Sequence, residues 1–134
     1  MLPKPSEGAV VLIDRMDGRG PHRWIVLTDP DDFGEFAIAS WSDAEKHPSR
    51  PSTWPKGTRL TSAYRLTKDS AIPVRFVAVR DEAWLDNSGA SFIGMALPAA
   101  LARAKCDVAT AADQLQPEPA SYLSAAVGAW MEEC

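Results

Sequence analysis

Short apolar runs rich in β-branched residues fill the first two thirds of the chain, and an alanine-rich stretch fills the last third. This order constrains the fold most, because strands followed by segregated helices are typical of an α+β arrangement. Too few strands are available for two packed sheets, which favours a small SH3-like β-barrel with C-terminal helices. We therefore predict a single domain over residues 1–134, with a barrel-like sheet over 1–96 and an acidic helical tail over 97–134.

The predicted strands are bounded by residues that favour turns. They cover residues 8–14, 23–28, 35–41, 58–66 and 72–79, and residues 90–96 fit either a last strand or the entry to the helices. Helices are expected over 99–105, 108–115 and 121–133, where alanine raises helix propensity. Pro117 and Pro119 should end the second helix, and an apolar stripe containing Trp130 should pack the last helix on the rest of the fold.

Residues 43–57 differ from the segments on either side. They contain three prolines, Pro48, Pro51 and Pro55, which is too many for a helix or a central strand. We expect a long exposed loop, and loops of this length in compact domains are often functional.

Charge is unevenly distributed along the chain. The net charge is −4, but residues 1–80 carry 12 Lys and Arg against 10 Asp and Glu, whereas residues 81–134 carry 2 against 8. Such asymmetry indicates either one face for an anionic ligand and another that repels it, or two solvated surfaces that differ by chance. Non-specific binding of nucleic acid by the whole domain is disfavoured, because phosphate neutralisation supplies most of that affinity.

The cysteines and the N-terminus indicate the compartment. Cys106 and Cys134 stand far apart and belong to no CxxC or Cys/His cluster, so we expect no disulfide framework and a reducing environment. The apolar run at residues 9–13 is too short for a signal peptide or a membrane span. We therefore expect a cytoplasmic protein without a membrane partner.

Motifs for common cofactors are missing from the sequence. It has no GxxxxGK[ST], GxGxxG, HExxH or GxSxG pattern, which disfavours nucleotide-dependent and zinc-dependent catalysis. His22 and His47 lie in loop-like segments, where a solvated side chain is the ordinary interpretation. We predict no metal and no cofactor.

One group of residues could bind a phosphate. Arg19, His22 and Arg23 lie at the start of the second predicted strand, Ser40 and Ser42 at the end of the third, and Arg59 follows in the next. In a meander the start of one strand lies beside the end of the next, so Arg23 should approach Ser42. A guanidinium fork and a hydroxyl would suit an oxyanion or phosphate. The alternative is that these are ordinary surface residues.

The tryptophans divide into two groups. Trp41 and Trp54 flank the proline-rich loop, where an exposed ring could stack on unpaired bases or anchor a protein interface. Trp24 and Trp130 are more simply core residues. Trp54 is the candidate for substrate binding.

Several segments resemble the MazF/PemK-like toxins of bacterial toxin–antitoxin systems. Residues 8–14 (GAVVLID) resemble the first strand of that family, and the glycine-containing loop at 17–20 follows it. Residues 22–28 are similar to its Arg-Pro-apolar strand, with Trp24 in place of the proline. Residues 36–42 resemble the strand that ends in a catalytic threonine, and residues 68–85 are similar to the passage before the terminal helix. The resemblance covers roughly residues 8–104.

The resemblance implies a metal-independent endoribonuclease that cleaves single-stranded RNA, with an antitoxin partner and a homodimeric state. It gives Arg23 a role in acid/base chemistry and phosphate stabilisation, and gives Ser42 the role of the threonine. Trp24, Ser42, the long loop and the acidic extension depart from the family pattern. Two alternatives remain: a non-catalytic binding or inhibitor protein encoded by a phage or mobile element, and a structural domain with an unknown partner.

Overall fold

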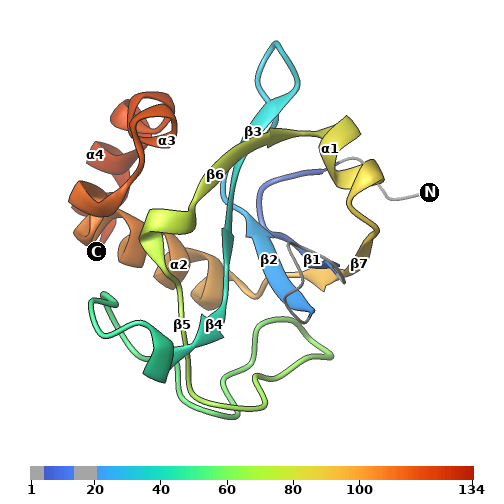
Figure 1. Ribbon diagram of the computed structural model, residues 1–134, viewed down its shortest axis with the longest axis vertical. Helices are drawn as coiled ribbons and strands as arrows, with labels where there is room; N and C mark the ends of the chain where they lie inside the picture. The colour runs from blue at the N-terminus through green and yellow to red at the C-terminus, as the bar shows by residue number, and fades with distance from the viewer. Residues whose placement is uncertain (1–4, 14–20) are drawn as a thin grey trace.

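Antiparallel strands form the centre of the fold. The computed structural model describes residues 5–13 and 21–134. Its larger sheet has five antiparallel strands in the order β6-β3-β2-β1-β7 (Figure 1). These strands are β1 (Ala9–Ile13), β2 (His22–Val26), β3 (Glu35–Ser40), β6 (Ala78–Asp81) and β7 (Ala90–Met95). A second sheet pairs β4 (Ser42–Asp43) with β5 (Ser70–Ala71).

Helices lie mostly after the strands. The α-helices of the described residues are α1 (Glu82–Asn87), α2 (Pro98–Thr110), α3 (Pro117–Tyr122) and α4 (Ser124–Glu133). Single 3-10 turns are η1 (Ala44–Lys46), η2 (Val74–Phe76) and η3 (Ala112–Gln114). The predicted α+β class is confirmed. Over the described residues β6 and β7 remain the two edges of the larger sheet, which does not close into a barrel.

Side chains alternate across the larger sheet and build a core on each face. Val10 and Ile25 point into one core, which also contains residues of α2 and α4. Val11 and Trp24, their neighbours along the chain, point into the other core together with Leu85 of α1. This period of two is expected of strands buried on both faces, and it explains why the apolar runs of β1 and β3 are nearly continuous.

The helical segment after residue 97 is part of the first core. Leu123 is fully buried and Trp130 is only 8 % exposed, and both pack with sheet residues. Figure 1 shows α2, α3 and α4 together on one side of the sheet. The expected packing of the Trp130 stripe is confirmed, so this acidic segment covers an apolar face.

Helix boundaries differ from the prediction. The helix expected over 99–105 and the start of the one expected over 108–115 form a single helix, α2, because Asp107 makes tertiary hydrogen bonds that outweigh its low helix propensity. The rest of the second expected helix is the 3-10 turn η3. Pro117 begins α3 instead of only ending the preceding helix, since proline suits a first helical turn. The last helix is divided at Leu123 into α3 and α4.

Two predicted strands are wrong. Residues 58–66 form no strand but a loop that makes isolated bridges, because Leu60 and Thr61 both donate their backbone N–H to the Tyr64 carbonyl and reverse the chain. Residues 72–79 are interrupted by η2, so only β6 at their end joins the sheet. Residues 90–96, left open between strand and helix entry, form β7.

A glycine in the edge strand β7 lets the loop of residues 58–66 pack closely on the sheet. Gly94 has φ +140°, a conformation rarely adopted by other residues, and a Cβ there would lie 3.3 Å from the Cβ of Thr61. Thr61 is bridged to Ala96 and is almost fully buried. Its Oγ1 accepts the backbone N–H of Tyr64 at 3.0 Å, which orients the Tyr64 turn.

The cysteines correct one expectation. Cys106 in α2 and Cys134 after α4 form a disulfide with a Cα–Cα distance of 5.6 Å. Sequence separation gave no sign of this pair, because α2 and α4 pack side by side only in the folded chain. The expected lack of disulfides is therefore wrong. None of the described helices has the length and apolar character needed to cross a membrane.

Candidate functional site

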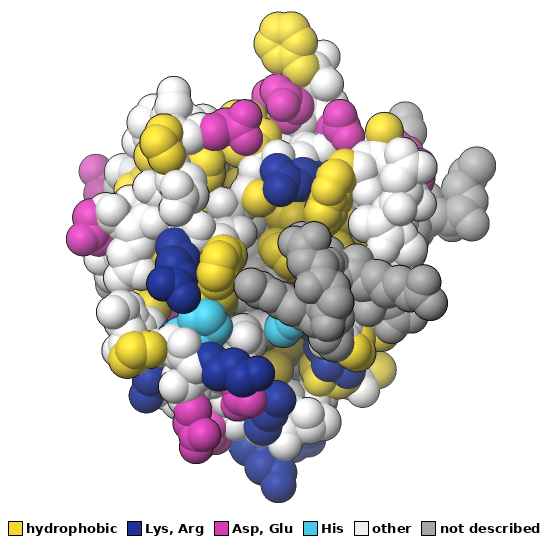
Figure 2. All heavy atoms as spheres, in the orientation of Figure 1, with side chains coloured by type: hydrophobic (Ala, Val, Ile, Leu, Met, Phe, Trp, Pro, Cys, Tyr) yellow, Lys and Arg dark blue, Asp and Glu magenta, His cyan; other side chains and the backbone are white. Residues whose placement is uncertain are grey.

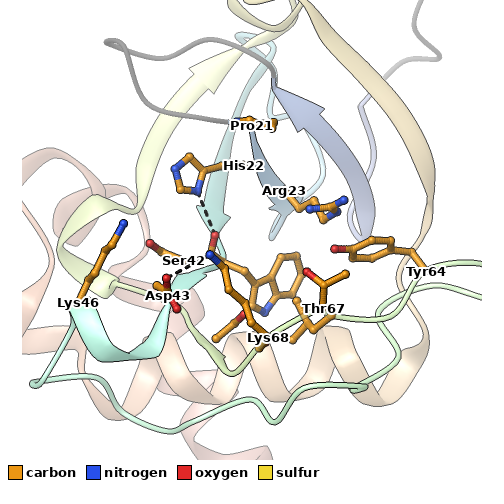
Figure 3. A pocket seen from close by; sticks show the side chains of 12 residues that line it. Pro21, His22, Arg23, Ser42, Asp43, Lys46, Tyr64, Thr67 and Lys68 are labelled. Atoms are coloured by element: carbon orange, nitrogen blue, oxygen red, sulfur yellow. Dashed lines mark hydrogen bonds and ion pairs between the residues drawn. The ribbon is translucent and has the colours of Figure 1, made fainter.

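A pocket opens where β2 begins and β3 ends. Its volume is about 100 Å³. The strands meet here because β2 and β3 are antiparallel neighbours, with Trp24 opposite Ser40. Most of the side chains that line it are polar or charged (Figure 3); the full set is Pro21, His22, Arg23, Trp41, Ser42, Asp43, Lys46, Tyr64, Leu66, Thr67, Lys68 and Ser70.

Arg23 occupies one side of this pocket. Its guanidinium lies over the ring of Tyr64, 3.9 Å from the ring centroid. Figure 3 shows the two side chains together, with Thr67 below them. The Arg23 side chain has no hydrogen bond or ion pair with a described residue, and its Nε is buried without a partner. A partly buried guanidinium without an acceptor is costly unless an anion completes it.

His22 and Ser42 occupy the other side. Carrying the β2–β3 register onward from Trp24 and Ser40 puts Arg23 beside Trp41 and His22 beside Ser42, and the Trp41 N–H donates to the Arg23 carbonyl at 3.0 Å. Successive residues of a strand point to opposite faces. Arg23 and Ser42 both line this pocket, and they extend into it from opposite sides of the strand pair (Figure 3).

The His22 ring has a defined hydrogen bond. Its Nδ1 lies 3.3 Å from the Trp41 carbonyl oxygen. A carbonyl oxygen only accepts, so Nδ1 carries the hydrogen and the neutral ring keeps a lone pair on Nε2. That nitrogen can take a proton from a hydroxyl group.

Basic side chains surround the pocket mouth. Lys46 and Lys68 are exposed, and Lys68 Nζ forms an ion pair with Asp43 Oδ2 at 3.1 Å. Residues 42–80 carry eight Lys and Arg against three Asp and Glu, a net charge of +5 within a chain of −4. Figure 2 shows both histidines and most of the visible Lys and Arg side chains in the middle and lower part of this face. The local field therefore favours an anion.

A second pocket adjoins the first. It has a volume of about 80 Å³ and shares His22 and Ser42 with the first pocket. Its other walls are Trp24, Ser40, His47, Pro73 and Phe76. Ser40, predicted as a binding residue, lies here rather than in the Arg23 pocket.

The other predicted residues have different places. Trp54 is fully buried and donates its Nε1–H to Asp107 Oδ2 at 2.8 Å, so the expectation that its ring is exposed for stacking is wrong. The hydrogen bond from Trp54 to Asp107 holds the proline-rich loop of residues 43–57 against α2. Arg59 is exposed and bridged to Arg65, outside the residues that line either pocket. Arg19 lies outside the described residues.

Sequence reasoning missed part of the site. Tyr64, Thr67, Lys46 and Lys68 come from the loops between β4 and β5. The sequence places Tyr64 in a predicted strand, Lys46 in the predicted proline-rich loop and Lys68 in a turn. The only sequence signal for Lys46 and Lys68 is the excess of positive charge within residues 42–80, and the uncharged Tyr64 and Thr67 have no such signal.

Buried nitrogen atoms without partners gather at these two pockets. The described side-chain atoms of this kind are Arg23 Nε, Trp41 Nε1 and Trp24 Nε1. Arg23 and Trp41 line the first pocket and Trp24 lines the second. No group of three or more His, Cys, Asp and Glu in the described part of the chain has a metal-binding arrangement.

Comparison with known proteins adds no relative. A scan against protein-family models finds no match to this chain, and a search of curated proteins finds none either.

Proposed function

We propose that the protein is an endoribonuclease that cleaves single-stranded RNA without a metal, at the pocket between Arg23 and His22. The observation that carries the proposal is the partly buried Arg23 guanidinium, which has no acceptor or counter-ion among the described residues. An arginine presents a planar fork of N–H donors that matches a phosphate. The positive charge of residues 42–80 supports the same ligand class.

The chemistry requires little beyond these residues. The RNA 2′-oxygen attacks the adjacent phosphorus, and its proton passes to His22 Nε2. The bond from phosphorus to the 5′-oxygen breaks, which leaves a 2′,3′-cyclic phosphate and a 5′-hydroxyl. Arg23 stabilises the charge that develops on the non-bridging oxygens. The hydroxyls of Ser42 and Tyr64 line the same pocket and are the neutral donors available to the leaving oxygen.

Single-stranded RNA fits this arrangement better than a duplex. The reacting 2′-hydroxyl must align with the phosphorus opposite the leaving oxygen, and a flexible single strand reaches that alignment more easily than an A-form helix. The pocket is small, so one phosphate enters it at a time. The antitoxin partner, the homodimer and the SH3-like arrangement implied by the resemblance stay predictions.

The decisive experiment incubates the protein with a mixed pool of single-stranded RNA in EDTA. We expect cleavage that leaves 5′-hydroxyl ends, which a polynucleotide kinase labels without prior phosphatase treatment. Arg23→Met and His22→Gln should each lose the activity. Arg59→Met is the matched control, because Arg59 is exposed and lines neither pocket. Cleavage that survives Arg23→Met contradicts the site.

A non-catalytic binding protein is the second candidate, and one surface feature favours it. Phe33 is 87 % exposed at the tip of the β2–β3 connection. Asp31 Oδ1 accepts the N–H groups of Phe33 and Glu35, both at 2.9 Å, so the tip is rigid. A preorganised exposed aromatic is a typical interface anchor. An intact RNA pool, together with a partner whose binding Phe33→Ser abolishes, would support this function instead.

A further inference from the structure

The second pocket differs from the first in the character of its walls. Trp24, Pro73, Phe76 and the imidazole of His47 line it together with His22, Ser40 and Ser42, whereas only the first pocket contains the cationic side chains Arg23, Lys46 and Lys68. Phe76 is 37 % exposed, so its ring is accessible to a ligand. Its ring contacts His47 edge to face, with centroids 6.2 Å apart. Aromatic walls beside a cationic pocket suit a flat ring attached to a phosphate.

The two pockets adjoin each other across shared side chains. His22 and Ser42 line both, so a ligand group in one pocket is adjacent to a group in the other. A third pocket, of about 80 Å³, continues the row and shares His47 and Pro73 with the second. Arg50, Arg75 and Gln114 line this third pocket. The row is therefore cationic, aromatic and cationic, which matches one nucleotide whose base branches from the backbone between two flanking phosphates.

Arg75 is the cation available in the third pocket. Its guanidinium lies 4.9 Å from the Phe76 ring centroid, and within the described ranges it pairs with no carboxylate. Arg50, in contrast, is occupied by hydrogen bonds to Thr53 Oγ1 and to the carbonyls of Ala44 and His47. Arg75 is exposed and can turn toward a phosphate.

We propose that the pocket of Trp24, His47, Pro73 and Phe76 binds a nucleobase of single-stranded RNA, next to a phosphate at Arg23, and that Arg75 binds the following phosphate. The inference rests on the proposed function for the identity of the first pocket's ligand. It adds a subsite for a base and a path for the RNA across the surface, from Arg23 to Arg75. Stacking on aromatic side chains is tolerant of base identity, so the subsite recognises the presence of a base more than its sequence.

Binding tests this proposal separately from cleavage. The probe is a fluorescent pentanucleotide with 2′-O-methyl groups, which lacks the nucleophile and cannot be cleaved, beside the same backbone with abasic sites. Fluorescence anisotropy gives the Kd. Phe76→Ala should weaken binding of the base-containing probe about tenfold and leave the abasic probe unchanged. Phe76→Tyr keeps a ring and should retain the tight binding.

Salt dependence tests the second phosphate. Arg75→Ala should weaken both probes and lower the slope of log Kd against log salt by about one phosphate contact. Arg59→Ala is the control and should leave the preference for bases unchanged. Equal weakening of both probes by Phe76→Ala, or an unchanged slope in Arg75→Ala, overturns the proposal, as does a wild-type protein that binds neither probe.

The two proposals fail in different ways. A protein that binds the probe through Phe76 but leaves the RNA pool intact has the base subsite without the ribonuclease activity. A protein that cleaves RNA but binds both probes equally has the activity without this subsite.

Discussion

Two tryptophans in contact with each other differ in their hydrogen bonding: the indole N–H of Trp54 has a partner and that of Trp41 has none among the described residues. Trp54 donates to Asp107, whose carboxylate also accepts the Ser52 hydroxyl at 2.8 Å, and Arg103 donates to the Thr53 carbonyl at 2.7 Å. Trp41 meets the Trp54 ring edge to face at 5.4 Å, yet its Nε1 has no partner in the described part of the chain.

The difference separates an anchor from a candidate site. Hydrogen bonds from Ser52 and Trp54 to Asp107, and from Arg103 to the Thr53 carbonyl, fix the proline-rich loop on α2. We call these residues the anchor, and every polar group named in it has a partner. On the pocket side, Arg23 carries a charge that no described group balances. Buried polar groups are normally hydrogen-bonded, so a buried Arg23 Nε without a partner requires an explanation. A ligand that supplies the missing acceptor is the explanation we propose.

The largest expected effect is on activity, from Arg23→Met. Methionine keeps much of the side-chain volume and removes the charge. Losing a donor that stabilises developing charge should lower the cleavage rate about 100- to 1,000-fold. Thermal unfolding should leave the Tm unchanged or raised, because an unsatisfied buried N–H is removed. A strongly lowered Tm would show that Arg23 is a structural residue like those of the anchor.

Breaking the disulfide should have the next largest effect. The Cys106–Cys134 bond spans a sequence separation of 28 residues and closes α4 onto α2. Constraint of the unfolded chain by a loop of that size is worth about 3–4 kcal/mol in the chain-entropy model. Replacing both cysteines by alanine should lower the free energy of unfolding by that amount in denaturant titrations. Activity of the folded protein should persist, and an unchanged unfolding midpoint in non-reducing buffer would argue against the bond.

Asp107→Ala should weaken the anchor itself. The buried Trp54 Nε1 and the Ser52 hydroxyl would both lose their acceptor. We expect a loss of about 3 kcal/mol in the free energy of unfolding, since each unsatisfied group costs about 1–3 kcal/mol. Asp113→Ala is the matched control, because Asp113 is exposed and a change there should stay within about 0.5 kcal/mol. Similar unfolding midpoints for the two variants would remove the contrast between anchor and pocket.

The smallest effect is expected at Tyr122, which joins α3 to β3. Its hydroxyl donates to the Glu35 carbonyl at 2.7 Å. Desolvation by burial, aided by the negative charges of Asp31 and Glu35, raises the pKa of Tyr122 above its ordinary value, against a hydrogen bond from Thr28 that lowers it. Tyr122→Phe should cost about 1 kcal/mol at neutral pH.

The alkaline behaviour of Tyr122 gives a second readout. Because the folded protein holds the phenol proton more tightly, its contribution to stability is complete below the unfolded pKa of about 10. It is lost as the pH rises through the folded pKa. The stability difference between wild type and Tyr122→Phe should therefore shrink above about pH 10. A difference that grows with pH would contradict the direction of the shift.

The local hydrophobic pattern was sufficient to predict strands where a single periodicity dominates the segment. The runs of β1, β2 and β3 are apolar on both faces, and their ends carry turn residues, so those strands were predictable within a few residues. The alternation of residues 58–66 was misleading, because the Thr61 and Tyr64 hydrogen bonds reverse the chain at that point. Arg23, His22 and Ser42 were predicted because they stand at strand ends. Tyr64 and Lys46 reach the pocket through loops whose path depends on distant contacts.

The sequence by itself determined the class of the fold, the concentration of helices in the last third of the chain and the excess of positive charge within residues 42–80. These follow from hydrophobic periodicity and composition, which act locally. Only the tertiary structure decided that Trp54 is buried on Asp107, that Cys106 meets Cys134, and that Arg23 faces Tyr64 while His22 lies beside Ser42. The physical reason is that packing of the whole molecule sets which distant residues meet. It also sets the strand register, and a register shift of one residue would move every side chain of a strand to the opposite face of the sheet.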